Sequence, residues 1–251
     1  MGGWALRRWT RFVLIAAVIA VASALATGCG ANETPALPRG SEPIRLDPDD
    51  FGGDVQNPYW PLERGSRWVY SESDAEASER RVEVTVTDRA KAILGIDAIV
   101  VHDLVTEEGQ PVEDTLDWYA VDRHGNLWYL GEDTKEFENG KVSTTKGSWE
   151  AGLDGAQAGI LVPGDPHVGM TYRQEYYAGE AEDVGEILSL DERAEVPFGS
   201  FENLLMTKDT TPLEPDVLEH KFYAEGVGPI LALGISGGGG REELLRFEPG
   251  S

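Results

Sequence analysis

The sequence predicts an all-β protein, a single antiparallel meander that curves into an open barrel or forms a sandwich, behind a signal peptide and a flexible tether. Three observations predict this fold. Short apolar runs recur between turn signals at intervals of about eight to twelve residues, as in all-β domains. Several of these runs alternate apolar and polar residues with the period of a strand. No window keeps the helical period over a length that would outweigh the strand pattern.

The first predicted strands follow residue 65. Residues 66–71 carry Trp68 and Tyr70, and residues 81–88 place Val82, Val84 and Val86 on one face. This strict alternation predicts an antiparallel strand with one buried side. Residues 98–105 are apolar nearly throughout, so we expect a strand near the centre of the sheet.

Residues 117–132 form the central predicted element, which we call the aromatic hairpin. Two aromatic runs flank a polar break that contains Gly125 and Asn126, and this pattern is typical of a β-hairpin. Trp118 and Ala120 share one face of the first strand and Tyr119 shares the other face with residue 121. Both faces are apolar, so we expect the hairpin to be covered on both sides. A second hairpin should turn at Asn139-Gly140.

Residues 147–166 interrupt the strand pattern. The segment is rich in glycine and proline, so we expect a long ordered loop, and long loops in compact domains often carry function. Strands are expected again over 170–177, 187–196, 201–209, 219–224, 230–233 and 242–247. Residues 223–228 are similar to the last hairpin of exported half-barrel lipoprotein carriers, an analogy of fold alone.

Acidic residues dominate the charge of the chain. Its 251 residues contain 45 Asp and Glu against 21 Lys and Arg, a formal net charge of -24. Nucleic-acid binding depends on basic side chains that neutralise phosphates, so we expect no nucleic-acid partner. Anionic lipid would also be repelled, and attachment to a membrane would need a covalent or apolar anchor. The acidity by itself keeps a protein soluble and dispersed.

The N-terminus has the layout of an export signal. Residues 1–12 carry Arg7, Arg8 and Arg11 without an acid, and an apolar run over 13–26 follows. This run is short for a bilayer span of roughly twenty residues and is typical of a secretory signal peptide. Small residues at the end of the run lead to Cys29, the single cysteine of the chain, so an intrachain disulfide is excluded.

Residues 26–29, Ala-Thr-Gly-Cys, resemble the lipobox of bacterial lipoproteins. Ala26 departs from the leucine that is commonest there. The resemblance implies cleavage after residue 28, acylation of Cys29 with fatty acids such as palmitate, and anchorage on the extracytoplasmic face of the cell membrane. An ordinary signal peptide with a coincidental cysteine and an uncleaved anchor helix remain alternatives. Arg7-Arg8 leaves twin-arginine and general export both open.

The chain therefore divides into three predicted parts. Residues 1–28 are the signal peptide, residues 29–54 are the lipidated N-terminus with a disordered linker, and residues 55–251 are one β-rich extracytoplasmic domain. The linker prediction rests on the proline, glycine and small polar residues that follow Cys29.

The sequence contains no catalytic motif that fits this fold. The four histidines are scattered singly, so we expect no metal site and no other cofactor. Trp128, Glu132, Trp149 and Asp154 are the candidate ligand-facing residues, because indoles and acids can line an apolar groove or a sugar platform. The expected function is non-enzymatic binding of an apolar ligand or an envelope protein. The alternative is an envelope glycan or polymer hydrolase with paired carboxylates.

Overall fold

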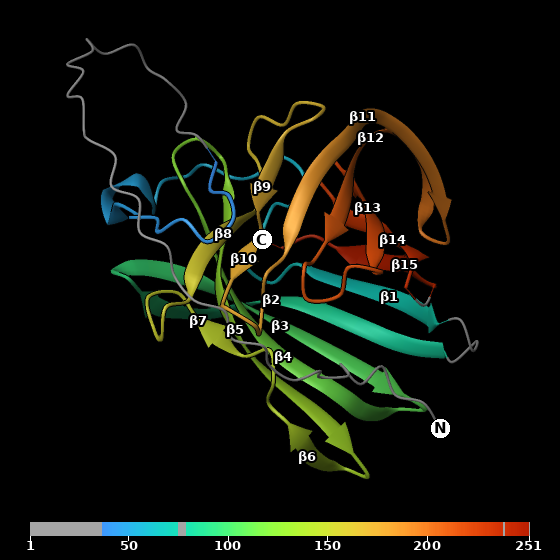
Figure 1. The fold of residues 1–251 in the computed structure, drawn as a ribbon. Coiled ribbons are helices and arrows are strands. Elements are labelled where there is room, and N and C mark those ends of the chain that lie inside the picture. Colours follow the sequence, from blue (N-terminus) through green and yellow to red (C-terminus); the bar gives the residue numbers. More distant parts are fainter. Residues whose placement is uncertain (1–36, 75–78, 238, 251) are drawn as a thin grey trace, which may run out of the picture. The chain divides into compact units, whose positions relative to one another are not determined.

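The computed structural model describes residues 37–74, 79–237 and 239–250, which form one antiparallel sheet of fifteen strands. Within this part of the chain, the single turn of 3-10 helix η1 (Pro48–Asp50) is the helical element. The all-β prediction is confirmed. The sheet is curved and open, and it is not divided into two packed sheets (Figure 1). No helix in the described ranges is long and apolar enough to cross a bilayer.

Fifteen strands follow η1 along the chain. The first eight are β1 (Arg67–Asp74), β2 (Glu79–Ile93), β3 (Ile96–Glu107), β4 (Gln110–Val121), β5 (Leu127–Glu138), β6 (Lys141–Thr144), β7 (Trp149–Glu150) and β8 (Gln157–Val162). The other seven are β9 (Thr171–Arg173), β10 (Glu175–Tyr176), β11 (Val184–Val196), β12 (Gly199–Thr210), β13 (Leu218–Ala224), β14 (Gly228–Ser236) and β15 (Gly240–Glu248).

The sheet consists of two antiparallel halves that join at its centre, where the first strand pairs with the last. The path runs β10-β8-β5-β4-β3-β2-β1-β15-β14-β13-β12-β11-β9, with β6 and β7 on the outer side of β5. The first and last strands, β1 and β15, are therefore hydrogen-bonded neighbours. Figure 1 shows the strands before and after this junction as two groups inclined to each other.

The aromatic hairpin is present as predicted, formed by the end of β4 and the start of β5, with Tyr119 opposite Tyr129. Its turn is organised by the Asp122 carboxylate, which accepts hydrogen bonds from the backbone N–H groups of His124 (2.8 Å) and Asn126 (3.0 Å) and from Trp128 Nε1 (2.8 Å). Trp118, Tyr119 and Ala120 are all buried. The expectation that both faces of the hairpin are covered is confirmed.

The predicted turn at Asn139-Gly140 is also confirmed. It joins β5 to β6, and both residues adopt positive φ (52° and 71°), the geometry that a two-residue hairpin turn requires.

The long loop predicted over 147–166 is only partly irregular. Residues 149–150 form β7 and residues 157–162 form β8, and both pair with β5. The glycines of this segment led the sequence analysis to predict a loop where these two strands lie. Gly159 lies in β8 because a side chain there would collide with the backbone of Arg173 and Gln174. The irregular parts that remain are residues 147–148, the bend between β7 and β8, and residues 163–166.

The two edges of the sheet approach each other within one short segment. β10 begins the path and β9 ends it, yet Gln174 alone separates these strands in the chain. Arg173 is 1% exposed, and its guanidinium donates hydrogen bonds to the carbonyls of Ala158, Gly40 and Glu42, each at 2.8 Å. The side chain thus ties β8 and the incoming N-terminal segment to the segment where the edges approach.

Ordered packing of the chain begins earlier than the domain boundary at residue 55 that the sequence predicts. Leu37, Ile44 and Leu46 pack against the core, and the backbone N–H of Arg173 donates to Pro38 O at 2.8 Å. Residues 37–54 are therefore part of the folded body, where the sequence predicted a linker. The predicted signal peptide and Cys29 lie outside the described residues.

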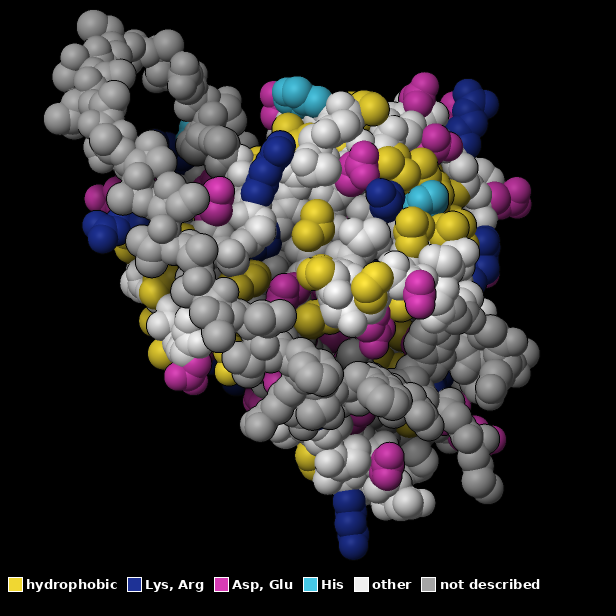
Figure 2. Space-filling view, in the orientation of Figure 1, with side chains coloured by type: hydrophobic (Ala, Val, Ile, Leu, Met, Phe, Trp, Pro, Cys, Tyr) yellow, Lys and Arg dark blue, Asp and Glu magenta, His cyan; other side chains and the backbone are white. Residues whose placement is uncertain are grey.

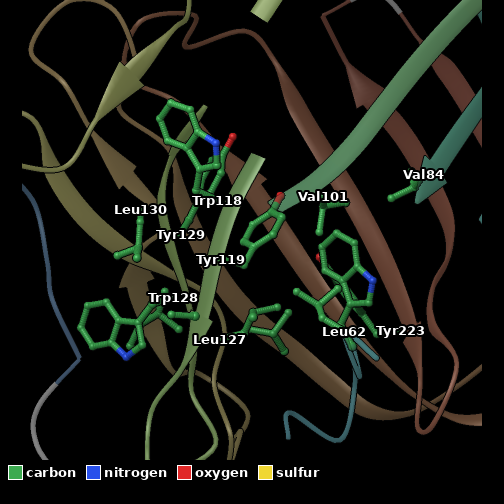
Figure 3. Packing of buried hydrophobic residues seen from close by; sticks show 14 of the residues in the cluster. Leu62, Val84, Val101, Trp118, Tyr119, Leu127, Trp128, Tyr129, Leu130 and Tyr223 are labelled. Atoms are coloured by element: carbon green, nitrogen blue, oxygen red, sulfur yellow. The ribbon is translucent and has the colours of Figure 1, made fainter. Parts of the chain in front are cut away.

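The core combines side chains from both halves of the sheet. Trp68 is fully buried, packs edge-on to Trp60 (centroids 6.2 Å apart) and stacks on Phe247 (5.1 Å). Its indole N–H donates to Val227 O at 2.8 Å, as a buried indole requires. Figure 3 shows Tyr119 of β4 and Tyr223 of β13 within the same core.

On the surface shown in Figure 2, acidic side chains are spread among hydrophobic ones.

Candidate functional site

A gap in strand pairing lies along the outer edge of β5. β8, β7 and β6 each pair with a different part of this edge. Between β7 and β6, the Ser148 side chain takes the place of a strand, because its Oγ accepts from Thr134 N at 2.9 Å and donates to Thr134 O at 3.3 Å. The side chain satisfies the backbone but fills less space than a paired strand.

A cavity of about 340 Å³ opens at this gap, and we call it the edge cavity. Its lining combines indole and phenol rings with carboxylates and one ammonium group: Lys91, Trp118, Glu132, Asp133, Ser148, Trp149, Glu150, Leu153, Asp154, Ala156 and Tyr177. Three of the four candidate residues from the sequence, Glu132, Trp149 and Asp154, are therefore brought together. They come from β5, β7 and the bend that follows β7.

The fourth candidate, Trp128, lies elsewhere. It is 6% exposed, its ring meets Phe51 edge-on at 6.4 Å, and its indole N–H is held by Asp122. It lines a separate cavity of about 300 Å³ beneath the N-terminal segment, together with residues such as Leu46 and Ile160. These contacts place Trp128 in the packing of that segment, apart from the edge cavity.

One wall of the edge cavity is a row of side chains on a single face of the sheet. The register aligns Lys91 with Ala98, Val100 with Trp118, and Gly131 with Glu150. Because residues at i and i+2 of a strand share a face, Lys91, Trp118 and Glu150 point to the same side. The Lys91 ammonium lies 3.1 Å from the Trp118 ring centroid and 2.7 Å from Glu150 Oε2.

The opposite face supplies the other wall. Trp149 lies across from Glu132 in the register, and its ring meets Tyr129 edge-on at 5.3 Å. Its indole N–H donates to Glu175 Oε2 at 2.9 Å. These contacts fix the Trp149 ring, which is 4% exposed. Trp149 therefore borders the cavity as a rigid wall.

Glu132 connects the cavity to a buried acid, because it stands opposite Asp117 on β4. Burial raises the pKa of Asp117 to about 7, against the hydrogen bond that Tyr129 Oη donates to its Oδ1 at 2.7 Å. Burial, with the charge of Asp117, raises the pKa of Glu132 to about 8. Like charges directly opposite each other are unfavourable, so this pair retains protons near neutral pH.

Further acids on the same face share this environment. Burial, reinforced by neighbouring carboxylates, raises the pKa of Asp103 and Glu175 well above the usual range and that of Glu242 to about 7. Lys221 pairs with Asp209 at 3.0 Å and Glu219 at 3.8 Å.

Within the described ranges, no group of three or more acidic, histidine or cysteine side chains has an arrangement that could hold a metal ion.

Lys91, Glu150 and Tyr177 were not among the residues that the sequence singled out. Lys91 belongs to a strand far from 147–166 in sequence, and only the pairing of β2 with β3 and of β3 with β4 brings it to the cavity. The sequence offers no signal for this. Asp117 and Glu132 lie at the two ends of the aromatic hairpin, so the hairpin register could have indicated that they face each other.

Neither a protein-family model nor a curated protein matches the sequence. The structure resembles an inferred lipoprotein of Parabacteroides distasonis ATCC 8503 at 11% identity and a TM-score of 0.43, over 78% of this chain and 100% of that chain. It also resembles an inferred exported protein with a YmcC-like fold from Bacteroides fragilis NCTC 9343 at 13% identity and a TM-score of 0.43, over 76% and 99% of the two chains. Both likenesses are remote.

Proposed function

We propose that this chain is an exported binding protein, anchored by lipid at Cys29, that holds a ligand in the edge cavity. The observation that carries the binding role is the convergence of Glu132, Trp149 and Asp154 on one cavity with Trp118 and Leu153. A concave site with apolar rings and a few polar groups is the usual form of a small-molecule site.

The proposed export and lipid anchorage rest on residues 1–29. A charged start, an apolar run and a small-residue sequence ending at Cys29 support export followed by cleavage. The mass of the mature protein extracted from membranes tests this step. A chain that begins at an acylated Cys29 supports the proposal, and a chain that keeps residues 1–28 or begins at another residue overturns it.

Native mass spectrometry of the domain purified from its own host tests the binding role. Leu153 lines the cavity and is 55% exposed, so Leu153→Arg should block the cavity without disturbing the core. Val168 is 64% exposed and does not line the cavity, so Val168→Arg is the matched control. We expect a small bound mass in the wild type and in the control and none in Leu153→Arg. Absence of bound mass from all three proteins contradicts the proposal.

A hydrolase remains the second candidate because of one observation. Asp117 and Glu132 face each other across β4 and β5, with pKa values of about 7 and about 8. Directly opposed residues have Cβ atoms about 5 Å apart, close to the carboxyl separation of retaining glycosidases. Release of reducing ends from envelope glycan, lost in both Asp117→Asn and Glu132→Gln, would support this candidate. Absence of release by the wild type would eliminate it.

A further inference from the structure

The ammonium group of Lys91 contacts both an indole ring and a carboxylate at the edge cavity. Its Nζ lies 3.1 Å from the centroid of the Trp118 ring and 2.7 Å from Glu150 Oε2. A cation over an indole face is attracted by the ring's electron density, and this attraction grows as water is excluded. Trp118 is 7% exposed, so the ring offers its face to the cavity and little else to solvent.

The charges around this arrangement favour a cation. Four carboxylic acids line the cavity, Glu132, Asp133, Glu150 and Asp154, against the single ammonium of Lys91. Glu132 keeps its proton near neutral pH and adds no charge there, so Asp133, Glu150 and Asp154 are the acids that can attract a cation. Asp133 is paired with Lys135 at 3.0 Å, outside the lining. Asp154 is exposed and has no ion pair within the described ranges. An incoming cation would therefore meet Asp154 before it reaches Trp118.

The mouth of the cavity is apolar as well as acidic. Leu153 is 55% exposed and Leu94 is 50% exposed, and Gly152 lies against the Leu94 side chain. Leu94 and Asp154 adopt positive φ, 51° and 49°, and each precedes a glycine of positive φ, Gly95 and Gly155, as in a two-residue turn.

We propose that the edge cavity binds a primary alkylammonium group, which displaces Lys91 from Trp118 and Glu150 while its apolar part packs against Leu153. This inference rests on the binding role proposed above and adds the chemical class of the ligand. A primary ammonium fits better than a quaternary one because the contact with Glu150 requires an N–H donor. Lys91 is the internal competitor that an incoming ligand replaces.

Titration calorimetry with n-butylammonium tests the proposal, with n-butanol as the neutral probe and tetramethylammonium as the probe without N–H donors. The wild type should bind n-butylammonium saturably and weakly, and Lys91→Ala should bind it about tenfold more tightly because the competitor is gone. Lys91→Met keeps an apolar chain over Trp118 and should not gain affinity. Lys208→Ala removes a lysine paired with Glu186 at 3.1 Å and should behave like the wild type.

The outcomes separate the ligand class from the binding role. Binding by Lys91→Ala without binding by the wild type would mean that the probe merely replaces a missing side chain, and would overturn the proposal. Equal binding of n-butanol and n-butylammonium would also overturn it, yet would leave the edge cavity as a binding site. Tighter binding of tetramethylammonium would contradict the role of Glu150. Loss of the co-purified mass in Leu153→Arg judges the binding role independently.

Discussion

Asp117 and Glu132 stand directly opposite each other on β4 and β5, at the two ends of the aromatic hairpin, and both carboxyls hold protons to near-neutral pH. Their ordinary values lie at 3.8 and 4.5, and their pKa values in the folded protein lie at about 7 and about 8. The unfolded chain therefore releases these protons at lower pH than the folded chain does.

Stability should consequently fall as pH rises from about 4 to about 8. Below the unfolded pKa values the contribution of these acids is fully present, and it is lost as pH rises through their folded values. Melting temperature measured across this range checks the direction. Asp117→Asn and Glu132→Gln should flatten the curve, whereas Glu202→Gln, an exposed acid paired with Arg193 at 3.2 Å, should leave its slope unchanged. A melting temperature that rises steadily from pH 4 to 8 would contradict this assignment.

Trp128→Ala should lower the free energy of unfolding by about 3–5 kcal/mol, because a buried ring is lost and a void remains. The substitution also leaves Asp122 without the indole N–H that now binds it at 2.8 Å. Urea unfolding followed by circular dichroism measures the change. Trp128→Phe keeps most of the ring volume and should cost less. Near-normal unfolding of Trp128→Ala would mean that the ring does not belong to the core.

Gly131→Ala should break the edge of β5. The glycine has φ of 133°, and a Cβ there would collide with the Trp149 backbone, so β7 would have to move and the edge cavity would change shape. Gly109→Ala is the matched control, because Gly109 also has positive φ (77°) but an open surrounding. The control should cost about 1–2 kcal/mol, because alanine disfavours positive φ, and Gly131→Ala should cost clearly more. Equal melting temperatures for the two variants would refute the close approach.

Arg173→Met should release the N-terminal segment from the sheet. The substitution removes three hydrogen bonds, to the carbonyls of Ala158, Gly40 and Glu42. Trypsin cleavage after Arg39 or Arg45 reports this release by mass spectrometry. Arg193→Met is the control, because that side chain is 74% exposed. Equal cleavage rates in the two variants would show that Arg173 does not hold the segment.

The sequence predicts the strands and the hairpins well because their signals are local. The alternating valines of β2 and the Asn139-Gly140 turn need no partner to be recognised. β8 was missed because it contains Gly159, where the absence of a side chain allows the backbone of Arg173 and Gln174 to approach. A glycine in a strand is predicted as a loop residue when the segment that packs against it is unknown.

The edge cavity was predictable only in part for a related reason. Glu132, Trp149 and Asp154 lie near one another in sequence, so the segment 147–166 and the aromatic hairpin indicated them together. Lys91 enters the site through the pairing of three strands. The early start of packing at Leu37 depends on Arg173, more than a hundred residues away, and composition alone suggested a linker.

Metabolic labelling of host cells with a fatty-acid analogue is the most direct test of the central claim that lipid at Cys29 holds this binding domain at the membrane. Wild type and Cys29→Ser would be compared for label and for recovery with the membrane fraction. The proposal predicts label and membrane recovery for the wild type and neither for Cys29→Ser. An unlabelled wild type, or equal labelling of both proteins, would contradict it.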